Sequence, residues 1–191
     1  MSSEFRLSVL IPVYNEVATL RTLLERVMAV PLRKELIVVD DYSTDGTRTV
    51  MEDFRRDHAD TDQNALKFVF HPHNQGKGAA IRSAVRLITG DYALIQDADL
   101  EYDPAEYPRL LQPILDGHAD VVFGSRFTGS PRRVLMYWHT LGNQLLTWFS
   151  NMCTNLNLTD METCYKVFKA DILQRIPLRS NRFGIEPELT A

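Results

Sequence analysis

The chain of 191 residues is poor in cysteine and has no excess of basic residues. Its two cysteines, Cys153 and Cys164, are too few for a disulfide framework or a four-cysteine metal site. We expect both to be reduced, buried and structural, which suits a cytosolic protein. The net charge of −4 argues against a nucleic-acid partner, because proteins that bind nucleic acids present a clustered basic face.

Long apolar runs are lacking as well. No uncharged apolar stretch approaches the roughly 18 residues that a membrane-spanning helix needs. The N-terminal segment, MSSEFRLSVLIPVYNE, has no basic leader before a long apolar run, so we expect no signal peptide. An apolar fraction of 45% and a charged fraction of 24% are ordinary for a globular protein, and the length fits one domain over residues 1–191.

Short apolar runs alternate with amphipathic stretches through the first half of the chain. The expected strands lie at Leu7–Val13, Glu35–Asp40, Leu66–Phe70, Tyr92–Gln96 and Asp120–Gly124. The expected helices lie at Thr19–Val30, from Thr44 or Asp45 to His58, at Gly78–Thr89 and at Pro104–Leu115, with Asp45 as a candidate N-cap. Strands that alternate with helices predict an α/β fold: a mostly parallel, Rossmann-like sheet with helices on both faces.

The pattern changes after about Thr128, and a segment from Val134 to Leu156 follows. That segment carries large apolar side chains at helical spacing: Trp138, Leu141, Leu145, Trp148 and Phe149. They predict either a helix packed on the sheet or a helix whose aromatic side meets a membrane surface. Near the end, Cys164–Phe168 is a candidate strand and Pro187 is well placed to begin a helix. Because a helix of one turn is unstable alone, we expect the natural protein to continue past Ala191.

Acidic residues follow three of the expected strands. The strand ends lead into Asn15-Glu16, Asp40-Asp41 and Asp97-Ala98-Asp99. Each pair alone could be a turn former or a helix cap. Together they indicate a site, because ligands bind outside the carboxyl ends of parallel strands and clustered carboxylates repel unless a cation lies among them.

The Asp97-Ala98-Asp99 segment is the sharpest of these motifs. Alternate residues of an extended segment point the same way, so both carboxylates can face one ion. Hard oxygen ligands favour Mg²⁺ or Mn²⁺, with phosphate oxygens completing the shell. Glu101 continues the spacing by two and is a candidate third ligand.

Two nearby segments are candidates for binding the rest of a nucleotide. Asp41 could form part of a turn, or it could hydrogen-bond a base or ribose. The segment Asn74–Gly78 precedes a helix and could bring Lys77 and backbone N–H groups toward an anion. Its glycine spacing is not that of a phosphate loop of the G-x-x-x-x-G-K type.

Basic and acidic residues of the second half are candidates for the acceptor region. Arg126 and the pair Arg132-Arg133 could hold a phosphate, although the pair could also be a solvated loop. Asp160 could lie near the acceptor or in a polar loop. His71 and His73 alternate at a strand end, but with no third ligand nearby we do not expect them to bind a metal.

The ordered set of motifs resembles glycosyltransferase family 2, and most of all its dolichyl-phosphate mannose synthase and polyprenyl-phosphate branch. The segments that carry the resemblance are VLIPVYNE, VVDDYSTDGT, NQGKGAAIR, IQDADLEYDP, GSRF and TDMETCYKVFK. The resemblance covers nearly the whole chain. It implies a GT-A fold, a nucleotide-sugar donor and an inverting reaction with Mg²⁺ or Mn²⁺.

The resemblance also implies roles for single positions. Donor contacts are expected from Pro12, Tyr14, Glu16, Val39, Asp41 and Ala98. The metal is expected on Asp97 and Asp99, with Glu101 a weaker match because relatives place a Gln or another polar ligand there. Arg126 matches an arginine that meets phosphates. Relatives continue past FGIEPEL to a strand and a basic segment that closes over the donor.

The expected acceptor is a polyprenyl or dolichyl phosphate at the cytoplasmic face of a membrane. A phosphate monoester is largely dianionic at pH 7 and needs little general-base help. One alternative is a family 2 enzyme that glycosylates a sugar hydroxyl, with Asp160 as the base. Another is a non-catalytic, receiver-like module that binds metal or phosphate. A Rossmann dehydrogenase is disfavoured because no G-x-G-x-x-G follows the first strand.

Overall fold

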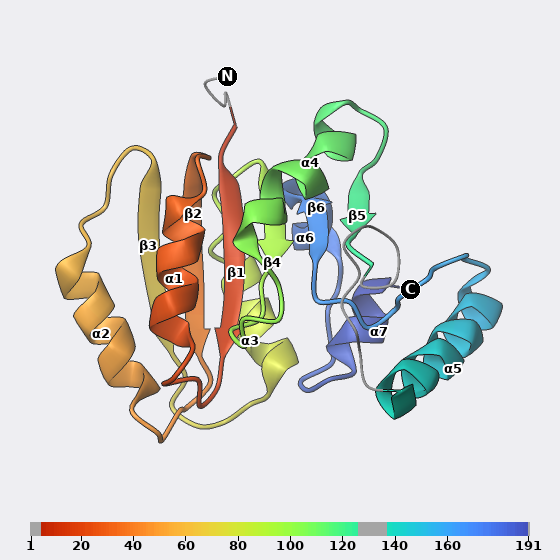
Figure 1. The fold of residues 1–191 in the computed structure, drawn as a ribbon, viewed down its shortest axis with the longest axis horizontal. Helices are drawn as coiled ribbons and strands as arrows, with labels where there is room; N and C mark the ends of the chain where they lie inside the picture. The colour runs from red at the N-terminus through yellow and green to blue at the C-terminus, as the bar shows by residue number, and fades with distance from the viewer. Residues whose placement is uncertain (1–4, 126–136, 191) are drawn as a thin grey trace.

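A six-stranded sheet organises the part of the chain that the computed structural model describes, residues 5–125 and 137–190 (Figure 1). Its order is β3-β2-β1-β4-β6-β5. The strands are β1 Leu7–Val13, β2 Lys34–Asp40, β3 Asn64–Phe70, β4 Tyr92–Ile95, β5 Val121–Phe123 and β6 Lys166–Lys169. The predicted strands are thus confirmed to within a few residues at each end.

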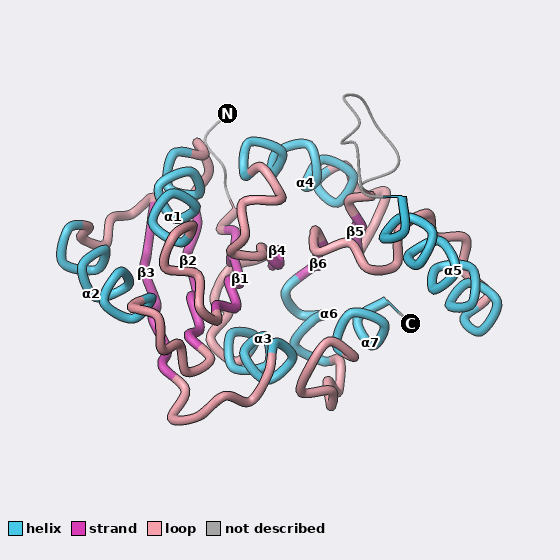
Figure 2. The backbone as a smooth tube through the Cα atoms, turned by 60° about the horizontal axis from the view of Figure 1, so that its bottom comes forward, coloured by secondary structure: helices cyan, strands magenta, loops and turns pink. Residues whose placement is uncertain are grey.

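Helices cover both faces of the sheet, as predicted. They are α1 Leu20–Ala29, α2 Thr47–Asp57, α3 Lys77–Val85, α4 Tyr107–Leu115 after a short 3₁₀ turn at Pro104–Glu106, α5 Tyr137–Thr154, α6 Ala170–Arg175 and α7 Ile185–Thr190. Helices α1 and α4 lie on one face, and α3, α6 and α7 lie on the other (Figure 2). Helix α5 stands apart from the sheet, beyond β5 (Figure 1).

The order in which successive strands are added to the sheet reverses at β1. Strands β1, β2, β3 and β4 run parallel, with β2 on one side of β1 and β4 on the other. Such a switch point opens a crevice at the carboxyl edge of the sheet. Strand β6 is antiparallel to β4, and Ile95 faces Lys166 across the pair. The amino end of β6 therefore lies at the same edge as the carboxyl end of β4.

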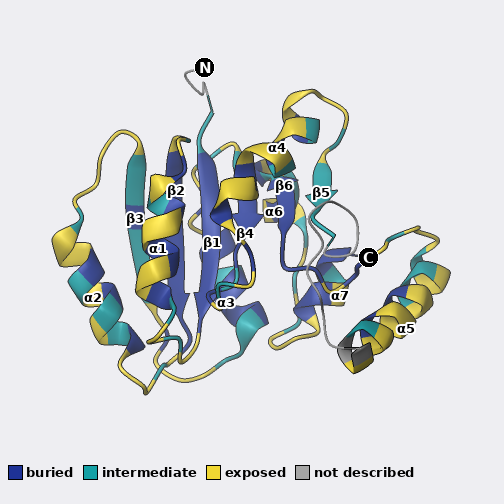
Figure 3. Cartoon of the chain, viewed as in Figure 1, coloured by how far each residue is buried: buried dark blue, intermediate teal, exposed yellow. Residues whose placement is uncertain are grey.

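The central strands form the core. Every residue of β1 and β2 is buried (Figure 3), as is typical of parallel strands covered on both faces. Helix α1 contributes a buried stripe at helical spacing, formed by Leu20, Leu23, Leu24 and Val27. This rigid centre positions the loops at the carboxyl edge.

Local details differ from the predictions at a few positions. Gly46, with a φ of 103°, is the N-cap of α2 in place of the predicted Asp45. Asp45 lies one residue before the N-cap, and its side chain accepts a hydrogen bond from the amide of Thr47, the first residue of the helix. Helix α7 begins at Ile185, before Pro187. Cys164 is buried as expected, but Cys153 is exposed on α5, so the expectation that both cysteines are buried was wrong.

A buried carboxylate links several segments at the edge of the sheet where β1 and β2 begin. Glu35 of β2 accepts hydrogen bonds from the Ser8 hydroxyl at 2.6 Å and from the Thr89 amide at 2.7 Å. Its other oxygen lies 2.7 Å from the Lys67 ammonium. Burial opposes the charge of Glu35, but the hydrogen bonds from Lys67, Ser8 and Thr89 outweigh it and hold the pKa below the ordinary value of 4.5.

This network predicts a pH-dependent contribution to stability. Glu35→Gln should lower the free energy of unfolding by about 1–3 kcal/mol at pH 7, because charged hydrogen bonds are lost. Since folding depresses the pKa, the contribution is complete above pH 4.5 and declines as the pH falls toward the folded pKa. Urea unfolding at several pH values measures it, with the exposed Glu25→Gln as control. If the wild type exceeded Glu35→Gln in free energy of unfolding by the same amount in acid as at pH 7, the role given to the Glu35 carboxylate would be contradicted.

Candidate active site

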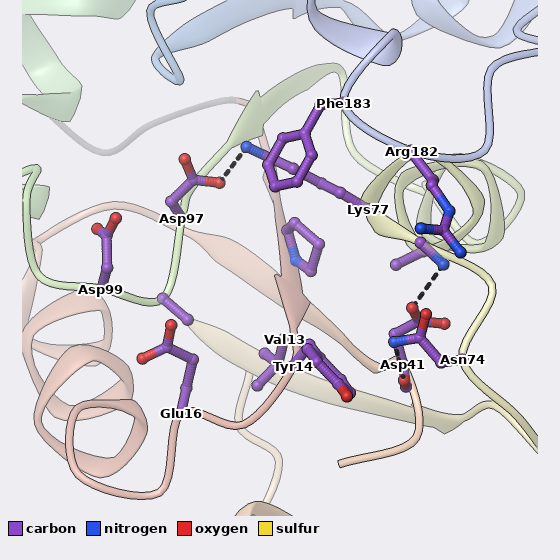
Figure 4. A pocket seen from close by; sticks show the side chains of 14 residues that line it. Val13, Tyr14, Glu16, Asp41, Asn74, Lys77, Asp97, Asp99, Arg182 and Phe183 are labelled. Atoms are coloured by element: carbon purple, nitrogen blue, oxygen red, sulfur yellow. Dashed lines mark hydrogen bonds and ion pairs between the residues drawn. The ribbon is translucent and has the colours of Figure 1, made fainter. Parts of the chain in front are cut away.

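A pocket of about 440 Å³ lies at the switch point between β1 and β4. Its size is within the usual range for ligand sites. The lining residues are Pro12, Val13, Tyr14, Glu16, Asp41, Asn74, Gly76, Lys77, Ala80, Asp97, Ala98, Asp99, Arg182 and Phe183. The structure therefore brings together all of the predicted donor-binding residues except Val39 (Figure 4).

The Asp97 carboxylate already faces a cation. Its Oδ1 lies 2.7 Å from the Lys77 ammonium, as Figure 4 shows. Burial alone would lower the pKa of Lys77, but nearby negative charge, with Asp97 first, raises it above its ordinary value. Lys77 is therefore an ammonium at any physiological pH.

Backbone contacts hold the Asp97 segment in place. The Gln96 side chain donates to the Asp97 carbonyl at 2.9 Å and accepts from the hydroxyls of Tyr107 and Tyr165. The Asp97 amide donates to the Cys164 sulfur at 3.1 Å. Burial raises the pKa of the Cys164 thiol well above its ordinary value, so this sulfur is an uncharged packing partner.

Asp99 lines the pocket, but Glu101 does not. The extended run stops at Leu100, whose φ is 62°, and the Glu101 amide turns back to donate to Asp99 Oδ1 at 2.9 Å. The side chains at positions 99 and 101 therefore do not point the same way, as they would in an extended segment. The position of Glu101 outside the lining gives no support to its prediction as a third ligand. Within residues 5–125 and 137–190 no three His, Cys, Asp or Glu side chains are grouped to hold a metal ion.

Asp41 is the anchor of the second donor-binding segment. Its Oδ1 accepts from the Gln75 amide at 2.9 Å and lies 2.7 Å from His71 Nδ1, while Oδ2 accepts from the Gly76 amide at 2.6 Å. On the other side of the ring, His71 Nε2 lies 2.9 Å from the Ser83 hydroxyl. The amides of residues 75 and 76 thus bind Asp41, which corrects the expectation that they are open to an external anion.

The other predicted residues of the second strand end are structural. Val39 is fully buried in β2, opposite Pro12 of β1, so its side chain belongs to the core and does not contact the pocket. Asp40 is fully buried and forms an ion pair with Arg48. Arg48 also donates to the His71 carbonyl, which ties the ends of β2 and β3 together.

Asp160 is not part of the pocket. It is 2% exposed, and its Oδ1 accepts from the Asn143 amide of α5 at 2.8 Å. The polar stripe of α5 packs on this loop, because Thr147 accepts from the Met161 amide. Asp160 therefore links its loop to α5, and its predicted catalytic role stays a prediction. Arg126, Arg132 and Arg133 lie outside the described residues.

Sequence reasoning missed the contribution of the last segments of the chain. Arg182 and Phe183 line the pocket from the loop between α6 and α7, with Arg182 on the side of Asp41 and Asn74 (Figure 4). Glu186 of α7 lies 2.8 Å from the Lys77 ammonium. The only available signal was the polar FGIEPEL segment, which supports the family resemblance but does not indicate a direction in space.

The loop that carries Arg182 docks on the glycines at the start of α3. A Cβ added to Gly78 would overlap the Ser180 carbonyl, and one added to Gly76 would overlap the Asn181 carbonyl. Arg82 of α3 donates to both residues of this loop. The two segments therefore form one wall of the pocket.

Comparison with known proteins agrees with the geometry. The family model described as glycosyl transferase family 2 matches residues 8–176, and the chain belongs to this family. Together with the described sheet and helices, this establishes a GT-A fold.

The undecaprenyl-phosphate mannosyltransferase of Micrococcus luteus is 30% identical over 97% of this chain and 76% of its own length. The undecaprenyl-phosphate 4-deoxy-4-formamido-L-arabinose transferase of Aeromonas hydrophila is also 30% identical, over 93% of this chain. The chain spans 56% of the length of that second protein.

A solved structure shares the fold. Glucosyl-3-phosphoglycerate synthase from Mycobacterium tuberculosis, in complex with Mn²⁺ and UDP-glucose, matches with a TM-score of 0.73 at 19% identity. The match covers 97% of this chain and 63% of that one.

The docked loop makes Gly78 a sensitive position. Gly78→Ala should lower the free energy of unfolding by about 1–3 kcal/mol, the usual cost of overpacking, because the loop at residues 180–181 must move. Gly142→Ala is the matched control, since a Cβ there meets nothing within 4 Å on helix α5. Thermal and urea unfolding of both variants measure the difference. Equal stabilities would show that the loop does not dock on α3.

Proposed function

We propose that the chain is the catalytic domain of an inverting glycosyltransferase that moves a sugar from a nucleotide-sugar donor to a polyprenyl phosphate. The observation that carries the proposal is the convergence of Asp41, Lys77, Asp97 and Asp99 on one pocket from separate segments. The names of the Micrococcus and Aeromonas relatives support the lipid-phosphate acceptor.

The pocket has an arrangement that suits a nucleoside diphosphate. Pro12, Tyr14 and Asp41 line the part formed by β1 and β2, and they are proposed to contact the base and ribose. Half of the Tyr14 side chain is exposed and free to meet a base. Lys77, Asp97 and Asp99 line the opposite part, where the diphosphate is proposed to lie, and Ala98 and Glu16 complete it.

The donor set fits a hard divalent cation, Mg²⁺ or Mn²⁺. Both Asp97 and Asp99 line the pocket, and two carboxylates completed by phosphate oxygens and water are a common site for these ions. The ammonium of Lys77 at Asp97 indicates that this position already attracts positive charge. A cation held by Asp97 and Asp99 would neutralise the charge that develops on the diphosphate leaving group.

The acceptor is proposed to attack without a carboxylate base. The alternative with a hydroxyl acceptor relied on Asp160, which is buried and bonded to Asn143. Of the carboxylates that do line the pocket, Asp41 is engaged by His71 and two amides, and Glu16 accepts from the Thr19 hydroxyl at 2.6 Å. A phosphate dianion needs no such base. On sequence grounds, Arg126, Arg132 and Arg133 are proposed to bind that phosphate.

Helix α5 supports a lipid surface as the location of the acceptor. Its buried residues, Asn143 and Thr147, are polar, whereas its exposed face is apolar. The exposed large apolar side chains of the helix are Trp138, Leu141, Leu145, Leu146, Trp148, Phe149 and Met152. The interpretation of this stripe as packed on the sheet is therefore wrong. Exposed Trp, Phe and Leu side chains are typical of the apolar face of a helix that lies in the interface of a bilayer.

None of the described helices has the length and apolar character needed to cross a membrane. From the exposed apolar side chains of α5, we propose that the outer face of this helix makes the contact with lipid.

The metal assignment predicts opposite outcomes for neighbouring carboxylates. Asp97→Asn should remove the dependence of UDP or GDP binding on Mn²⁺, because one of two charged ligands is lost. Glu101→Gln is the matched control and should retain it, since Glu101 does not line the pocket. Isothermal titration with Mn²⁺ and with a chelator measures both. Equal Mn²⁺ dependence in the wild type and Asp97→Asn would refute the assignment.

The tryptophans give a direct test of the lipid contact. The chain has two, Trp138 and Trp148, and both are exposed on α5, so intrinsic fluorescence reports on this helix. Vesicles that contain polyprenyl phosphate should shift the emission to the blue. Leu145→Ser with Phe149→Ser should weaken binding at least tenfold, because about 1.5–3 kcal/mol is at stake for each buried side chain.

Leu115→Ser, which removes an exposed leucine from α4, serves as the control and should bind like the wild type. Emission that stays at its water-exposed wavelength with vesicles of every composition would contradict the membrane proposal. It would favour another protein segment as the cover of this face.

A further inference from the structure

A row of four charged side chains, alternating in sign, runs from the core to the pocket. The Lys166 ammonium is fully buried and contacts both the Thr163 carbonyl and Glu186 Oε2. The other oxygen of Glu186, Oε1, lies 2.8 Å from the Lys77 ammonium, which in turn lies 2.7 Å from Asp97 Oδ1. The order is therefore Lys166, Glu186, Lys77, Asp97.

Each member comes from a different element. Lys166 begins β6, Glu186 lies on α7, Lys77 begins α3, and Asp97 follows β4. Glu186 has no described contact with the open part of the pocket, since it is not among the lining residues. Its two carboxylate oxygens are engaged by Lys166 and Lys77, so it is not available as a base.

These four side chains together carry no net charge, because two are cations and two are anions. A divalent cation on Asp97 would compete with Lys77 for the same carboxylate, because the cation and the Lys77 ammonium are both positive and repel each other. Glu186 offers Lys77 a second anion at nearly the same distance. Lys77 can then remain paired when Asp97 takes a metal ion.

We propose that Glu186 is a positioning residue that shares the Lys77 ammonium with Asp97 and retains it when Asp97 binds its cation. Lys166 anchors Glu186 for this purpose. The proposal rests on the proposed function, because it assumes a divalent cation at Asp97. It adds a role for α7, which lies about ninety residues from the metal-binding motif in the sequence.

The test measures how strongly Mn²⁺ improves the binding of UDP, with GDP in a parallel series. The quantity is the ratio of the dissociation constant in chelator to that in saturating Mn²⁺, from isothermal titration. In Glu186→Gln, Lys77 has only Asp97 as a partner, so the ratio should fall about tenfold or more. Part of the fall comes from weaker binding with Mn²⁺, and part comes from tighter binding of the negatively charged diphosphate in chelator.

Lys77→Met should change the ratio in the opposite direction. It removes the competitor at Asp97, and it also removes a cation that attracts the diphosphate in the absence of metal. The ratio should therefore rise. Glu188→Gln is the matched control on the same helix, because it removes the same formal charge from a residue that contacts Arg179 and Ser180 instead of Lys77. Its ratio should equal that of the wild type.

A double variant keeps the test independent of folding and of net charge. Glu186→Gln leaves the buried Lys166 unpaired, and an unpaired buried charge is destabilising. Glu186→Gln with Lys166→Met has the net charge of the wild type and no orphaned cation, yet Lys77 still lacks its second anion. The ratio should fall in this variant as well.

If the double variant folds and its ratio of dissociation constants equals that of the wild type, the proposed role of Glu186 is overturned. If Asp97→Asn abolishes the Mn²⁺ effect at the same time, the proposed function stands and only this inference fails. A wild-type protein whose nucleotide binding ignores Mn²⁺ would instead overturn the metal site, and this inference with it.

Discussion

Carboxylates from the ends of β2 and β4 meet at one edge of the sheet, and their mutual repulsion has to be offset within the protein. The offset differs for each carboxylate. Asp40 is paired with Arg48, and Asp41 is held by His71 and two backbone amides. Asp97 is paired with Lys77. Asp40 is fully buried outside the pocket, whereas Asp41 and Asp97 both line it, which is where chemistry can take place.

The reversal of β6 makes the third arrangement possible. A parallel strand at this position would place its carboxyl end at the site, but antiparallel β6 places its first residues there. Lys166 is thereby brought next to the end of β4, and the loops that follow return to cover the pocket with Arg182 and Phe183. The segments that follow β6 are therefore part of the site and not an appendage to it.

The sequence predicted the fold and the centre of the site because both depend on local signals. Alternating apolar runs identified β1 to β5, and the acidic strand ends identified Asp41, Asp97 and Asp99. The differences from prediction arose where tertiary geometry overrides spacing. The left-handed residue Leu100 turns Glu101 away, and strand pairing buries Val39.

Other features could not be derived from spacing at all. The direction of β6, and hence the place of Lys166 and Glu186, depends on contacts between residues far apart in the chain. The polar stripe of α5 faces Asp160, so the apolar stripe faces outward, against the usual expectation for a helix beside a sheet.

The central claim is that the pocket between β1 and β4 binds a nucleoside diphosphate through a cation on Asp97 and Asp99. Anomalous diffraction at the manganese edge, from crystals grown with Mn²⁺ and UDP or GDP, tests it most directly. The account predicts one strong anomalous peak in contact with both carboxylates, with the diphosphate bound to it and the base beside Tyr14 and Asp41. A peak elsewhere, or a nucleotide at the opposite edge of the sheet, would contradict it.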